Sequence, residues 1–191
     1  MGLERTVREI IDLVVDLGLV DLDSAAQNAL LSDALDDLLD EYGDTEQSAV
    51  LEILDALGFR YTLDHKAFSG LSRCSLGERR ERYNAELQMI AACTRGKLII
   101  SNVRLVDSDP DSTLQFDCNG IPQSWPVHPG DDEDEEATLT FATNLTTIPT
   151  GTVEQFCSVE CSGSDLSAEA VFGDPDVLTQ LGEQFGLTFE P

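Results

Sequence analysis

Two histidines and five cysteines are the side chains of this 191-residue chain that most readily do chemistry. His65 follows Asp64 and precedes Cys74, which allows a nucleophile–histidine–acid arrangement to be drawn. No G-x-S-x-G turn, Walker loop or G-x-G-x-x-G motif accompanies these residues. We therefore predict a protein that is not an enzyme and assign no catalytic residue. A small hydrolase that uses His65 or His128 is kept as an alternative.

The cysteine spacing argues against a zinc site. Cys157 and Cys161 are separated by three residues, whereas common zinc knuckles have a two-residue gap. An odd number of cysteines also argues against a disulfide framework. The sequence therefore predicts reduced, buried structural thiols.

One stretch is similar to the start of a calcium loop. Asp107, Asp109 and Asp111 occupy the first three ligand positions. Ser112 stands where that loop needs glycine, and Cys118 stands where it needs a bidentate glutamate. A polar hairpin tip accounts better for this stretch, so we predict no metal and no cofactor.

The charge is strongly negative and unevenly spread. The chain has 11 basic and 37 acidic residues, a net charge of -26, and residues 105–191 contain 18 acidic residues but no lysine or arginine. Binding to nucleic acid through phosphates needs clustered basic residues, and an anionic membrane would repel this chain. A field of one sign speeds encounter with a partner of the opposite charge, so we predict a basic protein partner. The surface of a structural domain from a salt-adapted organism is the alternative.

The densest acidic stretch follows the single tryptophan. Trp125 is flanked by prolines, and the run after it holds six carboxylates. Tryptophan is favoured at binding hot spots, and charges beside it add specificity. We predict that the partner-binding residues are Trp125, Asp131, Asp132, Glu133, Asp134, Glu135 and Glu136. A tryptophan packed under the edge of a sheet is the alternative for Trp125.

Helical periodicity dominates the first half of the chain and strand-like segments dominate the second. Apolar spacing and capping signals predict helices over residues 5–17, 24–42, 44–57, 75–94 and 175–185. Strands are predicted over residues 59–63, 98–106, 113–118, 121–127, 153–159 and 168–172. Residues 137–145 fit either a helix or a strand.

This order predicts an α+β fold, with N-terminal helices followed by a mostly antiparallel sheet and a C-terminal helix. We expect a single domain over residues 1–191, with a helical part over about 1–96 and a strand-rich acidic part over about 97–191. No apolar run approaches the length of a membrane span, and charges near the N-terminus argue against a signal peptide. The expected location is the cytoplasm.

In these respects the chain resembles the immunity proteins of bacterial polymorphic and contact-dependent toxin systems. The likeness is carried by the strand at 98–106, the strand ending in Trp125-Pro-Val127, the acidic run 131–136 and the segment 137–145. It implies a function: binding a cognate toxin domain and blocking its active site, with carboxylates standing in for nucleic-acid phosphates. An acidic nucleic-acid mimic that inhibits another target shares this electrostatics and is the alternative.

Overall fold

The computed structural model describes residues 5–20, 36–37, 43–63, 66–108, 111–127, 133–159 and 168–191. In this part of the chain the fold is α+β, as predicted, with five helices and two antiparallel sheets. The helices are α1 (Val7–Asp16), α5 (Glu46–Ala56), α6 (Leu76–Ala92), α7 (Glu133–Leu145) and α8 (Pro175–Phe185), and a short 3-10 helix η1 spans Leu71–Arg73. The strands are β1 (Arg60–Leu63), β2 (Ile100–Ser108), β3 (Asp111–Cys118), β4 (Ile121–Val127), β5 (Gln155–Val159), β6 (Ala168–Gly173) and β7 (Phe189–Glu190).

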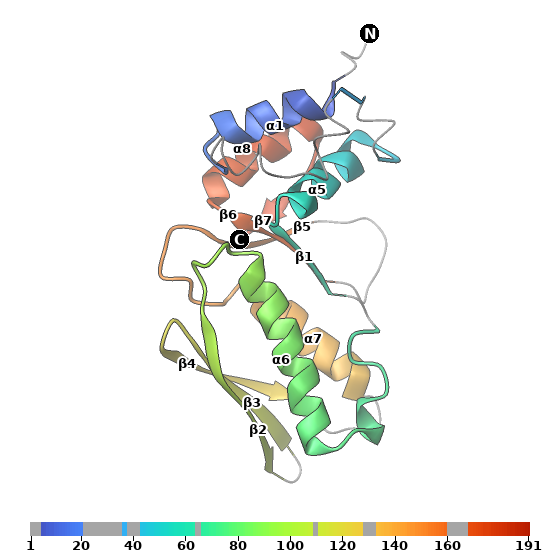
Figure 1. Cartoon of the computed structure of the whole chain (residues 1–191), viewed down its shortest axis with the longest axis vertical. Coiled ribbons are helices and arrows are strands. Elements are labelled where there is room, and N and C mark those ends of the chain that lie inside the picture. The colour runs from blue at the N-terminus through green and yellow to red at the C-terminus, as the bar shows by residue number, and fades with distance from the viewer. Residues whose placement is uncertain are drawn as a thin grey trace.

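A four-stranded antiparallel sheet lies in the middle of the molecule. Its strand order is β1-β6-β5-β7. Helices α1, α5 and α8 gather on one side of it, while α6, α7 and a second, three-stranded sheet lie on the other side (Figure 1). No described helix has the length and apolar character needed to cross a membrane.

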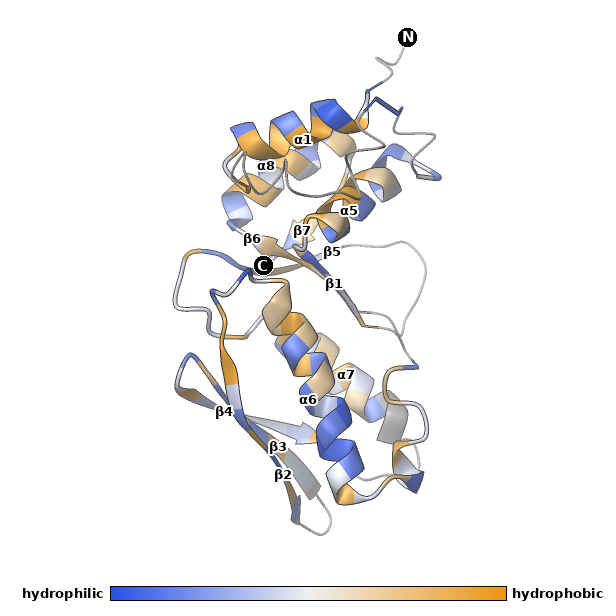
Figure 2. Cartoon of the chain, viewed as in Figure 1, coloured by the Kyte–Doolittle hydropathy of each residue, from blue (hydrophilic) through white to orange (hydrophobic). Residues whose placement is uncertain are grey.

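Both faces of the central sheet are apolar, because each side of it is covered. Successive residues of a strand point to opposite faces, so paired residues share a core. Cys157 pairs with Val171 in the core under α1, α5 and α8. Their neighbours Phe156 and Phe172 pair in the core toward α6 and α7. The sheet therefore contributes side chains to two cores at once, and orange segments face it from both sides in Figure 2.

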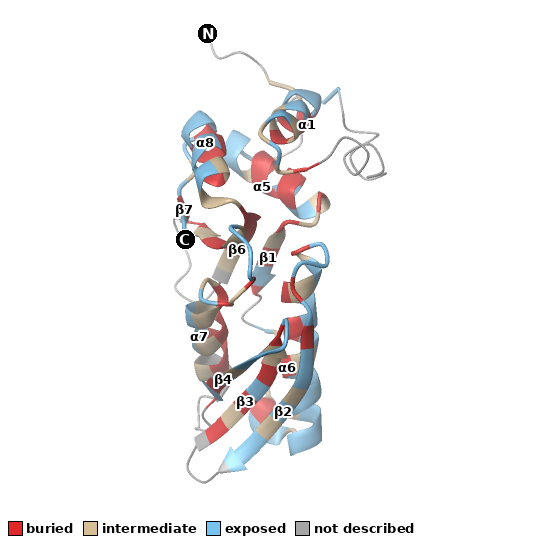
Figure 3. Ribbon diagram, turned by 90° about the vertical axis from the view of Figure 1, so that its left-hand side faces the viewer, coloured by how far each residue is buried: buried red, intermediate tan, exposed pale blue. Residues whose placement is uncertain are grey.

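The second sheet is a meander of β2, β3 and β4. Asn119 and Gly120 both have positive φ, 51° and 80°, and form the tight turn between β3 and β4 that their sequence predicts. Leu114 and Phe116 point inward and are buried, whereas Gln115 between them is exposed. Figure 3 shows this alternation of buried and exposed positions along β3.

Capping signals place most helix starts correctly. Ser75 and Glu78 form the expected capping box of α6, and Asp174 caps α8. For α5 the predicted pair of Asp44 and Gln47 is wrong by one residue. Thr45 is the cap instead, and its hydroxyl oxygen accepts the N–H of Ser48 at 3.0 Å. Thr45 has the extended backbone of a cap, with φ -144° and ψ 163°, so the helix begins at Glu46.

The segment 137–145, which fits two structures by sequence, is helical and belongs to α7. Ala137, Phe141 and Leu145 are four residues apart and all buried, so one helical face packs on the core. The preceding acidic residues stabilise the helix start through its dipole. The predicted helix 24–42 lies outside the described residues except for Asp36 and Asp37, which lie in a turn and a bend.

Candidate functional site

The acidic run predicted to bind a partner opens helix α7. Glu133, Asp134 and Glu135 are in its first turn, and Asp131 and Asp132 lie outside the described residues. Glu136 is half-buried, and its Oε2 atom is shielded from solvent without a hydrogen-bond partner in the described part of the chain. A shielded carboxylate oxygen costs free energy until a donor reaches it.

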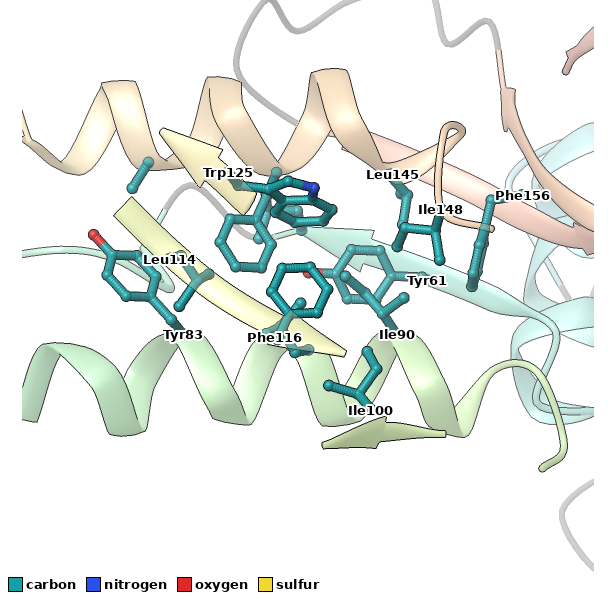
Figure 4. Close-up of a cluster of buried hydrophobic side chains, with 14 of the residues drawn as sticks. Tyr61, Tyr83, Ile90, Ile100, Leu114, Phe116, Trp125, Leu145, Ile148 and Phe156 are labelled. Carbon is teal, nitrogen blue, oxygen red and sulfur yellow. The ribbon is translucent and has the colours of Figure 1, made fainter. Parts of the chain in front are cut away.

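Trp125 lies in the core, which corrects its predicted role as a surface anchor. Its side chain is 4% exposed. The indole meets the rings of Phe116 and Phe141 edge-on, with centroids 4.9 and 5.1 Å away (Figure 4). Trp125 pairs with Leu114 of β3, and residues that pair directly across two strands point to the same face of the sheet. Both side chains are therefore on the buried face. An indole in this position has no free surface to offer a partner, so the core-packing alternative holds for Trp125.

Phe141 fixes α7, and thereby the acidic run, to the rest of the fold. Besides Trp125, its ring contacts Phe68 at 4.9 Å and stacks on Tyr83 at 6.0 Å between centroids. These partners come from β4, from the loop before η1 and from α6. The carboxylates at the start of α7 therefore stand on a helix that is held from three sides.

A second acidic surface is formed by α1, α5 and α8. Their outward faces carry exposed carboxylates and one arginine, Arg8, whose Nη2 atom pairs with Asp36 at 3.0 Å. We call this surface the acidic helical layer; its carboxylates are Glu9, Asp12, Asp16, Glu46, Glu52, Asp55, Asp176 and Glu183. Sequence reasoning did not single it out, because only packing on one sheet face brings the three helices together. In the sequence, each of these helices has carboxylates on the face opposite its apolar stripe, and this pattern could have indicated the acidic helical layer.

Several arginines gather around the other end of the molecule, where α6 begins. Arg79 Nε donates to the carbonyl of Cys74 at 3.1 Å, and Arg82 donates to the carbonyl of Ser69 at 2.6 Å. Arg80 forms an ion pair with its neighbour Glu81. The start of α6 thus combines three arginines with Glu78 and Glu81, whereas α1, α5 and α8 carry eight exposed carboxylates and one arginine.

The described residues give no support to the alternative catalytic and metal sites. His65 and His128 lie outside the described residues. In the calcium-like stretch, Asp107 Oδ1 accepts a hydrogen bond from Ser112 Oγ at 2.9 Å within the β2–β3 hairpin. Across the described ranges, no three histidine, cysteine, aspartate or glutamate side chains are grouped so as to hold a metal ion.

The four described cysteines are free thiols. Burial, with a smaller contribution from a nearby aspartate, raises the pKa of Cys93, Cys118 and Cys157 to about 11 in each case. Cys93 also donates to the carbonyl of Arg60 at 3.1 Å. The thiols of Cys93, Cys118 and Cys157 are therefore protonated at neutral pH. Cys161 lies outside the described residues.

We expect the fold to lose stability between pH 9 and pH 11. The thiols of Cys118 and Cys157, which are buried, and of Cys93, which is half-buried, ionise at about 11 when folded but at 9.0 when exposed. As the pH rises through this window the unfolded chain releases protons first, so the free energy of unfolding falls. Urea unfolding at pH 7.5, 9 and 10.5, with thiolate absorbance near 240 nm, measures both quantities. Equal stability at pH 7.5 and 10.5 would contradict the assignment.

Comparisons with family models, with curated proteins and with solved structures give no match for this chain. Its function is therefore inferred from its own charges and packing.

Proposed function

We propose that this chain binds a basic protein and neutralises it, as an immunity protein does with a toxin domain. The contact surface is the acidic run at the start of α7. The observation that carries the proposal is the charge distribution, since residues 105–191 contain 18 acidic residues and no lysine or arginine. Carboxylates in this segment can be paired only by cations from residues 1–104, as Glu154 is by Lys97 and Glu169 by Arg60, and such cations are too few for all of them.

The packing of α7 supports this surface. Binding costs less when the contacting groups are already ordered, and Phe141 anchors the helix that carries them. The shielded Oε2 atom of Glu136 has no described donor, so an arginine or lysine of a partner would supply a hydrogen bond that no described residue of the chain supplies. Because Trp125 is buried, it does not act as an aromatic anchor. Recognition of the partner therefore depends on charge and hydrogen bonding.

The acidic helical layer has a different part in the proposal. Its carboxylates lie on the far side of the central sheet from α7, so they act on an approaching partner through the long-range field. Such fields raise association rates by roughly 10–1,000-fold at low salt. The layer is therefore expected to attract a basic partner without forming the contact.

Charge-neutralising variants can distinguish direct contact by the acidic run of α7 from long-range attraction by the acidic helical layer. One variant replaces Glu133, Asp134, Glu135 and Glu136 by glutamine or asparagine, and a matched control replaces Asp12, Glu52, Asp55 and Glu183 in the same way. Both remove four charges from helix positions. The partner is captured from cells of the source organism, identified, produced in pure form and mixed with each variant in stopped-flow experiments at low and high salt.

The α7 variant is expected to slow association and also to speed dissociation by at least about tenfold, since it removes contacts. The layer control should slow association only. If both variants dissociate like wild type, or if the layer control alone dissociates faster, the α7 contact surface is wrong. A captured partner with a net negative charge, or an affinity independent of salt, contradicts the proposed function as a whole. The identity of the captured protein distinguishes a toxin domain from another target of a nucleic-acid mimic.

A further inference from the structure

The free edges of the two sheets differ in how they are protected. Unpaired edge strands attract other strands unless they are short, covered or interrupted by proline. β4 contains Pro122 and Pro126, and the carbonyl of Pro126 accepts a hydrogen bond from Thr140 of α7 at 2.9 Å. β1 has only four residues, with Cys93 donating to one of its carbonyls, and β7 has two residues. These three edges are therefore closed to a further strand.

β2 is the exception. It is nine residues long, forms an edge of its sheet and contains neither proline nor lysine. A bulge between Ser101 and Arg104, with Asn102 at a φ of 55°, interrupts its first part. From Arg104 to Ser108 its pairing with β3 is regular. This five-residue stretch is the longest regular free edge among the described strands.

A groove lies between α6 and residues 100–105 of β2, so it flanks the bulged part of the strand and meets the regular edge at Arg104 and Leu105. One hollow of about 220 Å³ is lined by Leu76, Gly77, Arg80, Val103, Arg104 and Leu105. It adjoins a second hollow of about 260 Å³, because Arg80 and Val103 line both. Leu76 is 44% exposed, so the first hollow offers apolar surface to solvent. An edge strand beside a helix, with a hollow for a side chain, is the arrangement in which extended peptides add to a sheet.

Two arginines, Arg80 and Arg104, border the first hollow, whereas Glu81 lines the second hollow and Asp107 is exposed further along β2. The Arg104 side chain is exposed and has no hydrogen bond or ion pair with any described residue, whereas the Arg80 side chain forms its one described ion pair with its exposed neighbour Glu81. Pairs between exposed neighbours contribute little stability and are readily exchanged. Both guanidinium groups are therefore available to carboxylates of a bound segment, although the chain as a whole is strongly acidic.

We propose that the groove binds an extended acidic peptide segment of another protein as an added strand on β2. Its main chain pairs with the free edge from Arg104 to Ser108. One of its aliphatic side chains enters the hollow beside Leu76, and flanking glutamate or aspartate side chains pair with Arg80 and Arg104. This surface is separate from the acidic run and does not depend on the proposed basic partner.

The test uses a synthetic eight-residue peptide of alternating glutamate and valine, at about 150 mM salt, where the Debye length is about 8 Å and local charges dominate. Two matched peptides serve as controls: one has alternate backbone nitrogens methylated, and the other has lysine in place of glutamate. Amide chemical shifts and hydrogen exchange of the full ¹⁵N-labelled chain report where each peptide binds. Arg104→Glu is compared with Arg73→Glu, which makes the same charge change at an exposed arginine outside the groove.

The glutamate peptide is expected to shift the amides of β2 and the start of α6 and to slow exchange along Arg104–Ser108. Methylation should abolish these shifts, and the lysine peptide should not produce them. Arg104→Glu should weaken binding by at least about tenfold, and Arg73→Glu by less than about threefold. Absence of shifts in β2, equal effects of the two substitutions, or binding of the methylated peptide at the same site would overturn the proposal. If β2 instead pairs with a second copy of the chain in a concentration-dependent way, the assignment of an acidic segment of another protein is wrong.

Discussion

Replacing Trp125 by alanine is expected to destabilise the fold by about 3–5 kcal/mol, the usual cost of removing a buried large aromatic side chain. The indole is 4% exposed and packs edge-on against Phe116 and Phe141. Its loss opens a cavity where β4, β3 and α7 meet. Because α7 begins with the acidic run, the same change should loosen the proposed contact surface.

Urea unfolding followed by circular dichroism measures this effect. Trp125→Phe keeps most of the ring contacts and should cost less than half as much, and Ser124→Ala, at the exposed neighbouring position, should change stability by less than about 0.5 kcal/mol. If Trp125→Ala unfolds like wild type but no longer binds a partner, the residue belongs to the interface after all.

The second large effect is expected for Tyr61→Phe. The Tyr61 hydroxyl donates to Glu86 Oε2 at 2.8 Å in the core between β1 and α6, where Glu86 is 8% exposed. Burial, with the adjacent Glu86 carboxylate, raises the pKa of Tyr61 well above its usual range, so the phenol keeps its proton and remains a donor. Removing the donor from a buried carboxyl group should cost about 1.5–3 kcal/mol.

A double-mutant cycle isolates the hydrogen bond from the packing of the ring. Tyr61→Phe, Glu86→Leu and the double variant are compared by urea unfolding. The double variant should be less destabilised than the sum of the single ones, because it removes the Tyr61 donor and its Glu86 acceptor together instead of leaving either without the other. Strict additivity would mean that the two side chains do not stabilise each other.

Local signals in the sequence predicted much of the fold. The capping box of Ser75 and Glu78, the Asn119-Gly120 turn and the Asp174 cap each specify structure within a few residues, and all three are confirmed. Helix or strand for 137–145 could not be decided by spacing. Thr138 and Thr140 fit a strand, whereas the helix depends on Phe141 reaching a pocket built by distant residues.

Features of the candidate site that depend on tertiary packing were less predictable. The excess of carboxylates is plain in the sequence, but the side to which Trp125 points is set by its pairing opposite Leu114. Likewise, the acidic helical layer exists because α8, from the end of the chain, packs beside α1 and α5. The groove along β2 combines residues of α6 and β2 whose types alone give no motif.

The strand order of the central sheet also governs how the chain can fold while it is synthesised. Arg60 of β1 pairs with Val171 of β6, so the ribosome must add about one hundred residues before β1 meets its partner. Until then the apolar faces of α1 and α5 lack the sheet that covers them. A nascent chain of this kind remains open to aggregation and to chaperones for most of its translation. Because β6 and β5 contribute to both cores, a stalled or truncated product loses the two cores together rather than keeping one of them.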